Sequence, residues 1–97
     1  MDRGFVSRPT NVIFIGKKPI MTYVNATLTL LSNESTVTIK ARGRNITFAV
    51  DVSQMIVKRM NAMGYKVSDV RIFSDKMTSL DGKERNVSTM EIDVSST

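Results

Sequence analysis

The stretch NVIFIGKKPIMTYV, residues 11–24, decides the fold because its hydrophobic period changes partway along it. Its first five residues are almost uninterruptedly apolar and end at Gly16, which is typical of a short buried strand. Pro19 is favoured in the first turn of a helix. The next apolar residues recur at spacings of three, four and three, namely Met21, Val24, Leu28 and Leu31. The stretch therefore predicts a strand, a Gly-Lys-Lys loop and an amphipathic helix.

Downstream, the sequence predicts one more strand and one more helix. Residues 36–41, TVTIKA, alternate apolar and polar side chains as a strand does. We expect this strand to run parallel to the first, because a helix separates them. The tripeptide RGR at residues 42–44 provides a tight connection. A second helix is expected over residues 45–63, with Gly64 as its C-terminal cap.

The last third of the chain predicts a β-hairpin. Two strand-like segments, residues 67–78 and 83–94, are joined across an Asp-Gly dipeptide, which is a strong signal for a tight turn. Residues 74–86 carry few large apolar side chains and are expected to project from the body. Residues 1–10 are expected to form a flexible tail. The predicted fold is α/β, an α+β sandwich of order βαβαββ in a single domain over residues 1–97. Its mixed four-stranded sheet packs on two helices and carries an extended C-terminal hairpin.

Composition excludes several classes of function. The 97 residues include no Cys and no His, which removes thiolate nucleophiles, disulfides, the usual zinc sites and imidazole acid–base chemistry. We therefore expect no enzyme activity, no metal site and no cofactor. Residues 1–10 hold no apolar run typical of a signal peptide or membrane anchor. With the lack of cysteine, this predicts a cytoplasmic protein that does not act on membranes.

Positive charge is concentrated in the first part of the chain. The formal net charge is +5, and residues 1–60 hold nine basic and three acidic side chains against five and six in residues 61–97. Two tight clusters lie at junctions between predicted elements, and they consist of Lys17, Lys18, Lys40, Arg42 and Arg44. Loops that follow parallel strands gather at one edge of a sheet, so these cations are expected to converge.

A row of phosphates is the natural complement of five converging cations, because Lys acts as a point charge and Arg grips phosphate oxygens in pairs. Gly16 and Gly43 are expected to let backbone N–H groups approach an anion as well. A mononucleotide pocket is the rival interpretation, but the glycines form neither of the usual phosphate-loop patterns. The charge pattern therefore favours an extended polyanion.

The second predicted helix has two apolar stripes, of which one can cover a sheet. The surplus stripe consists of Phe48, Val52 and Ile56, with Met55 beside it. We expect little else in so short a chain to bury this stripe. These four residues are therefore predicted to form a dimer interface.

The motifs IGKKP at residues 15–19 and KARGR at residues 40–44, together with the segment from the Asp-Gly turn to VSTMEI at residues 87–92, are specific in their order and separation. Over residues 11–94 the chain resembles the Alba family of archaeal chromatin proteins. The resemblance implies a dimer, either a homodimer or a heterodimer with a paralogue, that binds double-stranded DNA and RNA without marked sequence preference. Such a protein coats, compacts or bridges the duplex and is chromosome-associated.

The resemblance also implies roles for particular residues. The body would contact nucleic acid through Lys17, Lys18, Lys40, Arg42, Gly43 and Arg44. The hairpin would lie along the minor groove and contact it through Lys76, Lys83 and Arg85. Acetylation of Lys17 or Lys18 would delete a phosphate-pairing charge. Met60 stands where some relatives have an aromatic residue that packs dimer against dimer on DNA. Phe48 stands where many relatives have a basic residue.

Two other functions remain open from the sequence. A subunit of an RNA-processing ribonucleoprotein would use the second helix as a protein interface and prefer one structured RNA. An enzyme acting on nucleic acid would need acids such as Asp51, Glu91 or Asp93, of which the last two are expected to face solvent. No aromatic row suited to stacking single-stranded bases is visible, since Phe14 is expected in a buried strand, so duplex binding is favoured.

Overall fold

The computed structural model describes residues 11–96, so the tail expected at residues 1–10 lies outside the described residues. The element order is the predicted βαβαββ. Two single-turn 3-10 helices flank the second helix, at Gly43–Asn45 and Asn61–Met63. The six main elements are β1 (Val12–Phe14), α1 (Ile20–Leu31), β2 (Thr36–Arg42), α2 (Ile46–Met60), β3 (Tyr65–Thr78) and β4 (Glu84–Ser96).

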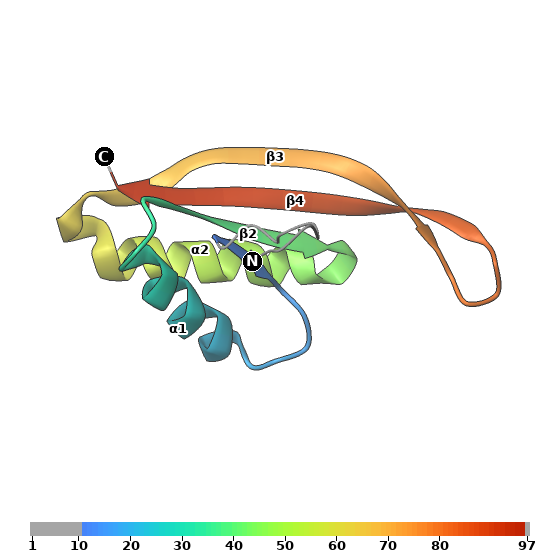
Figure 1. Cartoon of the computed structure of the whole chain (residues 1–97), viewed down its shortest axis with the longest axis horizontal. Helices are drawn as coiled ribbons and strands as arrows, with labels where there is room; N and C mark the ends of the chain where they lie inside the picture. Colours follow the sequence, from blue (N-terminus) through green and yellow to red (C-terminus); the bar gives the residue numbers. More distant parts are fainter. Residues whose placement is uncertain (1–10, 97) are drawn as a thin grey trace, which may run out of the picture.

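The four strands form one mixed sheet in the order β1-β2-β4-β3. As predicted, β1 and β2 are parallel, with Phe14 opposite Lys40, while β2 with β4 and β4 with β3 are antiparallel. Both helices lie on the same side of the sheet (Figure 1). The other side, which we call the outer sheet face, carries no helix of residues 11–96. Neither helix in the described part of the chain is long and apolar enough to span a membrane.

The core lies between the sheet and the two helices, and α1 packs against α2 as well as against β1 and β2. The alternation in β2 directs Val37, Ile39 and Ala41 inward, where each is at most 2% exposed. They meet apolar side chains of β4 and both helices, among them Ile92, Val94, Ala49, Val24 and Leu31.

Packing within the chain buries most of the second apolar stripe of α2. The prediction that all four residues of this stripe form a dimer interface is therefore wrong for Val52 and Ile56. Val52 and Ile56 are 0% exposed and belong to the core of the chain itself, so they have no surface to offer a second copy. The physical reason is that α1 covers the stripe that the sheet does not cover. Phe48 is 48% exposed and Met55 is partly buried against the core, and their role at an interface stays a prediction.

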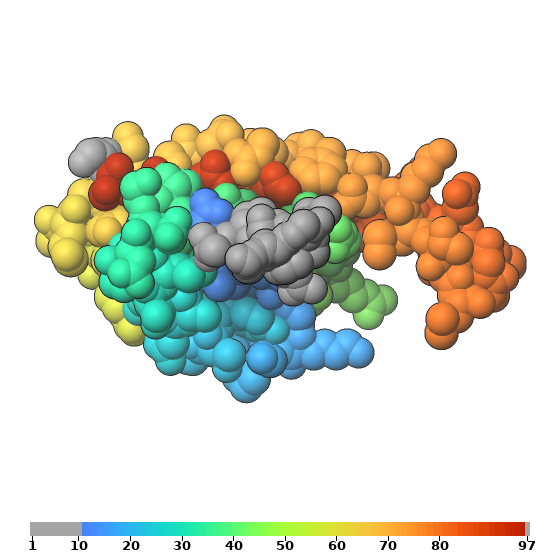
Figure 2. All heavy atoms as spheres, in the orientation of Figure 1, coloured from blue at the N-terminus to red at the C-terminus, as the bar shows by residue number. Residues whose placement is uncertain are grey.

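The β3–β4 hairpin continues beyond the start of α2. Its ladder pairs Tyr65 with Ser96 at the body and Thr78 with Glu84 near the tip, with a bulge between Val67 and Asp69. Figures 1 and 2 show its far half standing clear of the body, which gives the chain its longest dimension of 48 Å. The extended hairpin that the fold prediction contained is therefore present.

Candidate nucleic-acid interface

The connections after β1 and β2 lie at the same edge of the sheet, as parallel pairing requires. We call residues 16–18 the lysine loop and residues 42–44 the arginine turn. The backbone N–H of Ile15 donates to the carbonyl of Lys40 at 2.9 Å, and the side-chain amide of Asn45 donates to the carbonyl of Ile15 at 3.3 Å. These two hydrogen bonds join the residues that flank the lysine loop and the arginine turn.

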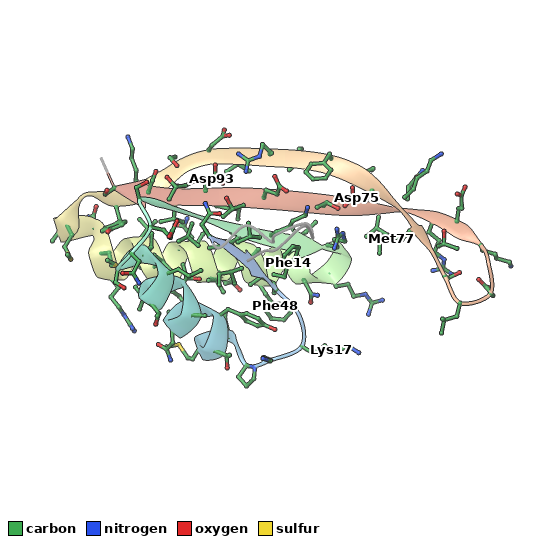
Figure 3. The ribbon with its side chains drawn as sticks, in the orientation of Figure 1. Phe14, Lys17, Phe48, Asp75, Met77 and Asp93 are labelled. Carbon is green, nitrogen blue, oxygen red and sulfur yellow. The ribbon has the colours of Figure 1, made fainter. Side chains whose placement is uncertain are left out.

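The lysine loop is held by one buried phenol. Tyr23 on α1 is 8% exposed, and its hydroxyl oxygen accepts hydrogen bonds from the backbone N–H groups of Gly16 at 2.8 Å and Lys18 at 2.9 Å. Tyr23 therefore already occupies two of the backbone N–H groups that Gly16 was expected to bring close to an anion. The loop instead presents the side chains of Lys17 and Lys18, which are exposed, and Figure 3 shows Lys17 pointing away from the body.

A cavity of about 500 Å³ lies behind the lysine loop, between α1 and the start of α2. Its walls include Ile20, Tyr23, Asn45 and Phe48 together with the loop itself. Phe48, predicted for a dimer surface, thus lies beside the two lysines, where it adds apolar area next to positive charge.

The arginine turn packs at the base of the hairpin. Gly43 has φ +57°, a left-handed conformation that L side chains rarely adopt, and a Cβ on it would lie 3.9 Å from Val87 Cγ1. Arg42 Nε pairs with an Asp75 carboxylate oxygen at 3.1 Å across to β3. Arg44 is exposed. The turn therefore places one arginine against the hairpin and one in solvent.

The outer sheet face carries a network of ion pairs. Arg71 on β3 pairs with Asp69 at 2.7 Å and with Glu91 and Asp93 of β4 at 2.9 Å each. Thr38 donates to Asp93 from the other side at 2.7 Å. The guanidinium of Arg71 holds the pKa values of the Glu91 and Asp93 carboxyls below their usual range, and these carboxylates raise the pKa of Arg71.

Glu91 and Asp93 were expected to face solvent, but their side chains are only 20% and 18% exposed. They are committed to cation partners and held ionised, which is the opposite of what a general acid needs near neutral pH. Asp75 is similar, because its hydrogen bond from Arg42 lowers the pKa of its carboxyl. Asp51 stands exposed on α2, apart from this network.

Lys40 belongs to the outer sheet face rather than to the edge. Its ammonium lies 3.1 Å from Glu91, and its side chain is 19% exposed. Two aromatic rings flank it, Phe14 at 5.8 Å and Phe73 at 5.6 Å from the ring centres. Phe14 is 53% exposed, so the prediction of a buried position for it is wrong; β1 is an edge strand with only one covered face.

The remaining predicted cations form a second group, which we call the unpaired cations. They are exposed and form no ion pair with any carboxylate in residues 11–96, and they are Lys17, Lys18, Arg44, Lys76, Lys83 and Arg85. The lysine loop and the arginine turn lie on the side of the body next to the hairpin in Figure 2. Positive charge thus follows one edge of the body and continues along the hairpin.

The hairpin cations occupy both faces of the ribbon. Lys76 is opposite Asn86, and Arg85 is opposite Met77. Directly opposed residues share a face and adjacent residues alternate, so Lys76 and Arg85 project to opposite sides.

Sequence reasoning missed an exposed apolar strip along β3. Val70 is 49% and Ile72 is 74% exposed, and both lie on the helix side of the sheet, opposite Ile92 and Met90. Ile72 lines a shallow cavity with Ile46 at the start of α2, and one turn farther along α2 Val50 is 39% exposed. Val70 and Ile72 are two residues apart in a strand, and this spacing in the sequence could have indicated that they share one face.

Known proteins resemble this chain in sequence. The sequence profile of the Alba family matches residues 11–74. The DNA/RNA-binding protein Alba of Nitrosopumilus maritimus is 50% identical over 84 residues, which cover 87% of this chain and 88% of that relative.

Solved structures resemble it in fold. Alba from Thermoplasma volcanium superposes with a TM-score of 0.79 at 37% identity, covering 88% of this chain and 99% of that one. ALBA1 from Trypanosoma brucei gives a TM-score of 0.67 at 24% identity, covering 94% of this chain and 73% of that one, and this match concerns the fold alone.

Proposed function

The chain belongs to the Alba family, and from that premise we propose that it binds double-stranded DNA and RNA without marked sequence preference. The relative from Nitrosopumilus maritimus is named for DNA and RNA binding, which supports the ligand class. The observation that carries the proposal within this molecule is the line of unpaired cations along the sheet edge and the hairpin. The binding is physical, without catalysis.

Phosphates are the natural partners of these cations. Lys17, Lys18 and Arg44 are exposed on two connections that hydrogen bonds hold together, so they reach one stretch of sugar–phosphate backbone. Contacts to phosphate carry no sequence information, which explains the proposed indifference to sequence. Arg42 contributes the part of its guanidinium that Asp75 does not use, since its side chain is 38% exposed.

The hairpin fits a groove, and we propose the minor groove. Lys76 and Arg85 project from opposite faces of the ribbon, and a groove has a phosphate-lined wall on each side. A ribbon lying flat on a duplex would engage only one face.

A second copy of the chain completes the proposed binding unit. Val70 and Ile72 of the strip on β3, and Val50 beside them on α2, are apolar and exposed, and burial against a symmetric copy would remove them from water. The dimer therefore forms at the β3 edge and α2, in place of the core residues expected from the sequence.

Three finer features belong to the same proposal. Dimers assemble further along DNA through Met60, which is partly buried against the core. Acetylation of Lys17 or Lys18, both exposed, weakens binding by removing a charge. The protein works on the chromosome in the cytoplasm.

Binding of one random 40-base-pair sequence, prepared as DNA and as RNA duplex, tests the proposal across a salt series, with protein mass from light scattering. If a dimer neutralises about eight to ten phosphates, log K falls against log salt with a slope of roughly −7 to −9. Similar and steep curves for both duplexes, from a species of twice the chain mass, are expected. Weak binding to both, or strong preference for one structured RNA, contradicts the proposal and favours a ribonucleoprotein subunit.

A further inference from the structure

The tip of the hairpin presents one large apolar side chain to solvent. Leu80 has a relative exposure of 110%, the highest among the exposed large apolar residues of the described chain. Its neighbours in the turn, Ser79, Asp81 and Gly82, are polar or lack a side chain. An isolated exposed leucine is ordinary on a protein surface. Its place at the end of a cationic arm is what makes it informative.

The turn that carries Leu80 is fixed by its own hydrogen bonds. Ser79 N–H donates to the Lys83 carbonyl at 2.9 Å, Gly82 N–H donates to the Ser79 carbonyl at 2.9 Å, and Lys83 N–H donates to the Asp81 carboxylate at 3.1 Å. The Ser79 hydroxyl also donates to Asp81. Gly82 has φ +82°, which closes the turn. The tip thus holds Leu80 outward on a defined turn.

The sides of the arm and its tip offer different chemistry. Lys76 and Arg85, on opposite faces of the ribbon, suit the two phosphate walls of a groove. An arm that enters the groove tip first, with its sides against the two walls, points its tip at the base pairs. A branched aliphatic side chain forms no hydrogen bond with base edges. It gains apolar contact when it enters between two stacked bases.

We propose that Leu80 is a wedge that inserts between adjacent base pairs and kinks the duplex. This inference rests on the proposed function, because it needs the hairpin to lie in a groove. The wedge unstacks one base step per arm and bends the duplex by roughly 20 to 90°, in the range of other apolar wedges. Flexible TA steps are kinked most easily, so the wedge enters there in preference to A-tracts. The protein then bends DNA as well as coating it.

The test uses a DNA duplex with a donor and an acceptor dye at its ends and 2-aminopurine within its TA steps. Energy transfer reports bending, 2-aminopurine fluorescence rises when the base unstacks, and anisotropy of the same duplex reports binding. The wild-type protein is compared with Leu80→Gln, which replaces the wedge with a polar side chain. The matched control is Met77→Gln, a change at an apolar position 42% exposed on the side of the arm. Leu80 is fully exposed, and circular dichroism verifies that both variants fold.

We expect the wild-type protein and Met77→Gln to raise both energy transfer and 2-aminopurine fluorescence. Leu80→Gln binds with the same salt dependence but loses both signals. Binding without unstacking by the wild-type protein overturns the wedge and leaves the proposed function intact. Equal bending by Leu80→Gln also overturns the wedge. If the wild-type protein does not bind the duplex at all, both proposals fail.

Discussion

The outer sheet face and the edge with its hairpin contain the same residue types and use them in opposite ways. On the outer sheet face Lys40 and Arg71 each lie within 3.1 Å of a carboxylate, so their charges are paired with acidic side chains of the same chain. On the edge and the hairpin the six unpaired cations have no such partner in residues 11–96. The position of a cation relative to its cross-strand neighbours therefore decides whether it stabilises the fold or is available to a ligand.

The largest effect is expected where three unpaired cations are removed together. Each phosphate contact contributes about −0.9 to the slope of log K against log salt. At 0.1 M salt, relative to 1 M, this corresponds to roughly an eightfold gain in affinity per contact. The variant Lys17→Ala/Lys18→Ala/Arg44→Ala should therefore lose at least about a hundredfold in affinity for duplex DNA, measured by anisotropy.

A matched control removes the same charge from the opposite end of the molecule. Lys58, Arg59 and Lys66 are exposed near the end of α2 and the start of β3, at the opposite end of the molecule from the tip of the hairpin (Figure 1). Screening over about 10 Å limits their influence, so alanine at all three should change affinity only a few-fold. Equal losses from the two triple variants would show that net charge, rather than placement, controls binding.

A smaller loss, on the order of tenfold, is expected from Lys76→Ala/Lys83→Ala/Arg85→Ala. These side chains stand on a projecting arm and lose more conformational freedom on binding, which offsets part of each contact. The same anisotropy measurement gives the affinity, and thermal unfolding should be unchanged because the three side chains are exposed. Unaltered affinity would remove the hairpin from the interface.

Arg71→Gln probes the paired region and should change stability instead of binding. It leaves Glu91 and Asp93, each about a fifth exposed, without their guanidinium partner. We expect the free energy of unfolding to fall by about 1 kcal/mol, and the midpoint of thermal unfolding by roughly 4–8 °C. Arg85→Gln, which removes an unpaired cation, is the control and should unfold as the wild type does. The comparison fails if the two variants unfold alike.

The pH dependence of stability follows from the lowered carboxyl pKa values. A carboxyl whose pKa is lower in the folded state contributes stability that is complete above its unfolded pKa, about 4, and is lost as the pH falls through the folded pKa. Asp75, Glu91 and Asp93 are of this kind. Urea unfolding between pH 6 and pH 3 should show stability falling below about pH 4, less steeply in Arg71→Gln. A steeper fall in that variant would contradict the assignment.

The order of elements could be predicted because hydrophobic period is a local property. The switch at residues 11–24 and the alternation in residues 36–41 need no knowledge of distant neighbours. The dimer prediction failed at Val52 and Ile56 because it depends on tertiary packing. The contact of α1 with α2 buries these residues, and a local pattern does not reveal that contact. Only Phe48 of that stripe is largely exposed.

The candidate site was predictable in its cations and unpredictable in their partners. The parallel pairing that brings the lysine loop and the arginine turn to one edge follows from the order of elements. Register, however, sets Lys40 opposite Glu91 and brings Arg42 to Asp75, and register depends on the whole sheet. Tyr23, which occupies the backbone N–H groups of the lysine loop, lies on a helix face and gave no signal of that role.

The most direct test of this division of the cations is the salt dependence of duplex binding by two single variants. Arg44→Gln removes an unpaired cation and Arg71→Gln removes a paired one, so their net charges are equal. With two protomers bound, Arg44→Gln should make the slope of log K against log salt shallower by about 2, at about 0.9 per lost phosphate contact, while Arg71→Gln should leave the wild-type slope. Equal slopes for the two variants would contradict the account.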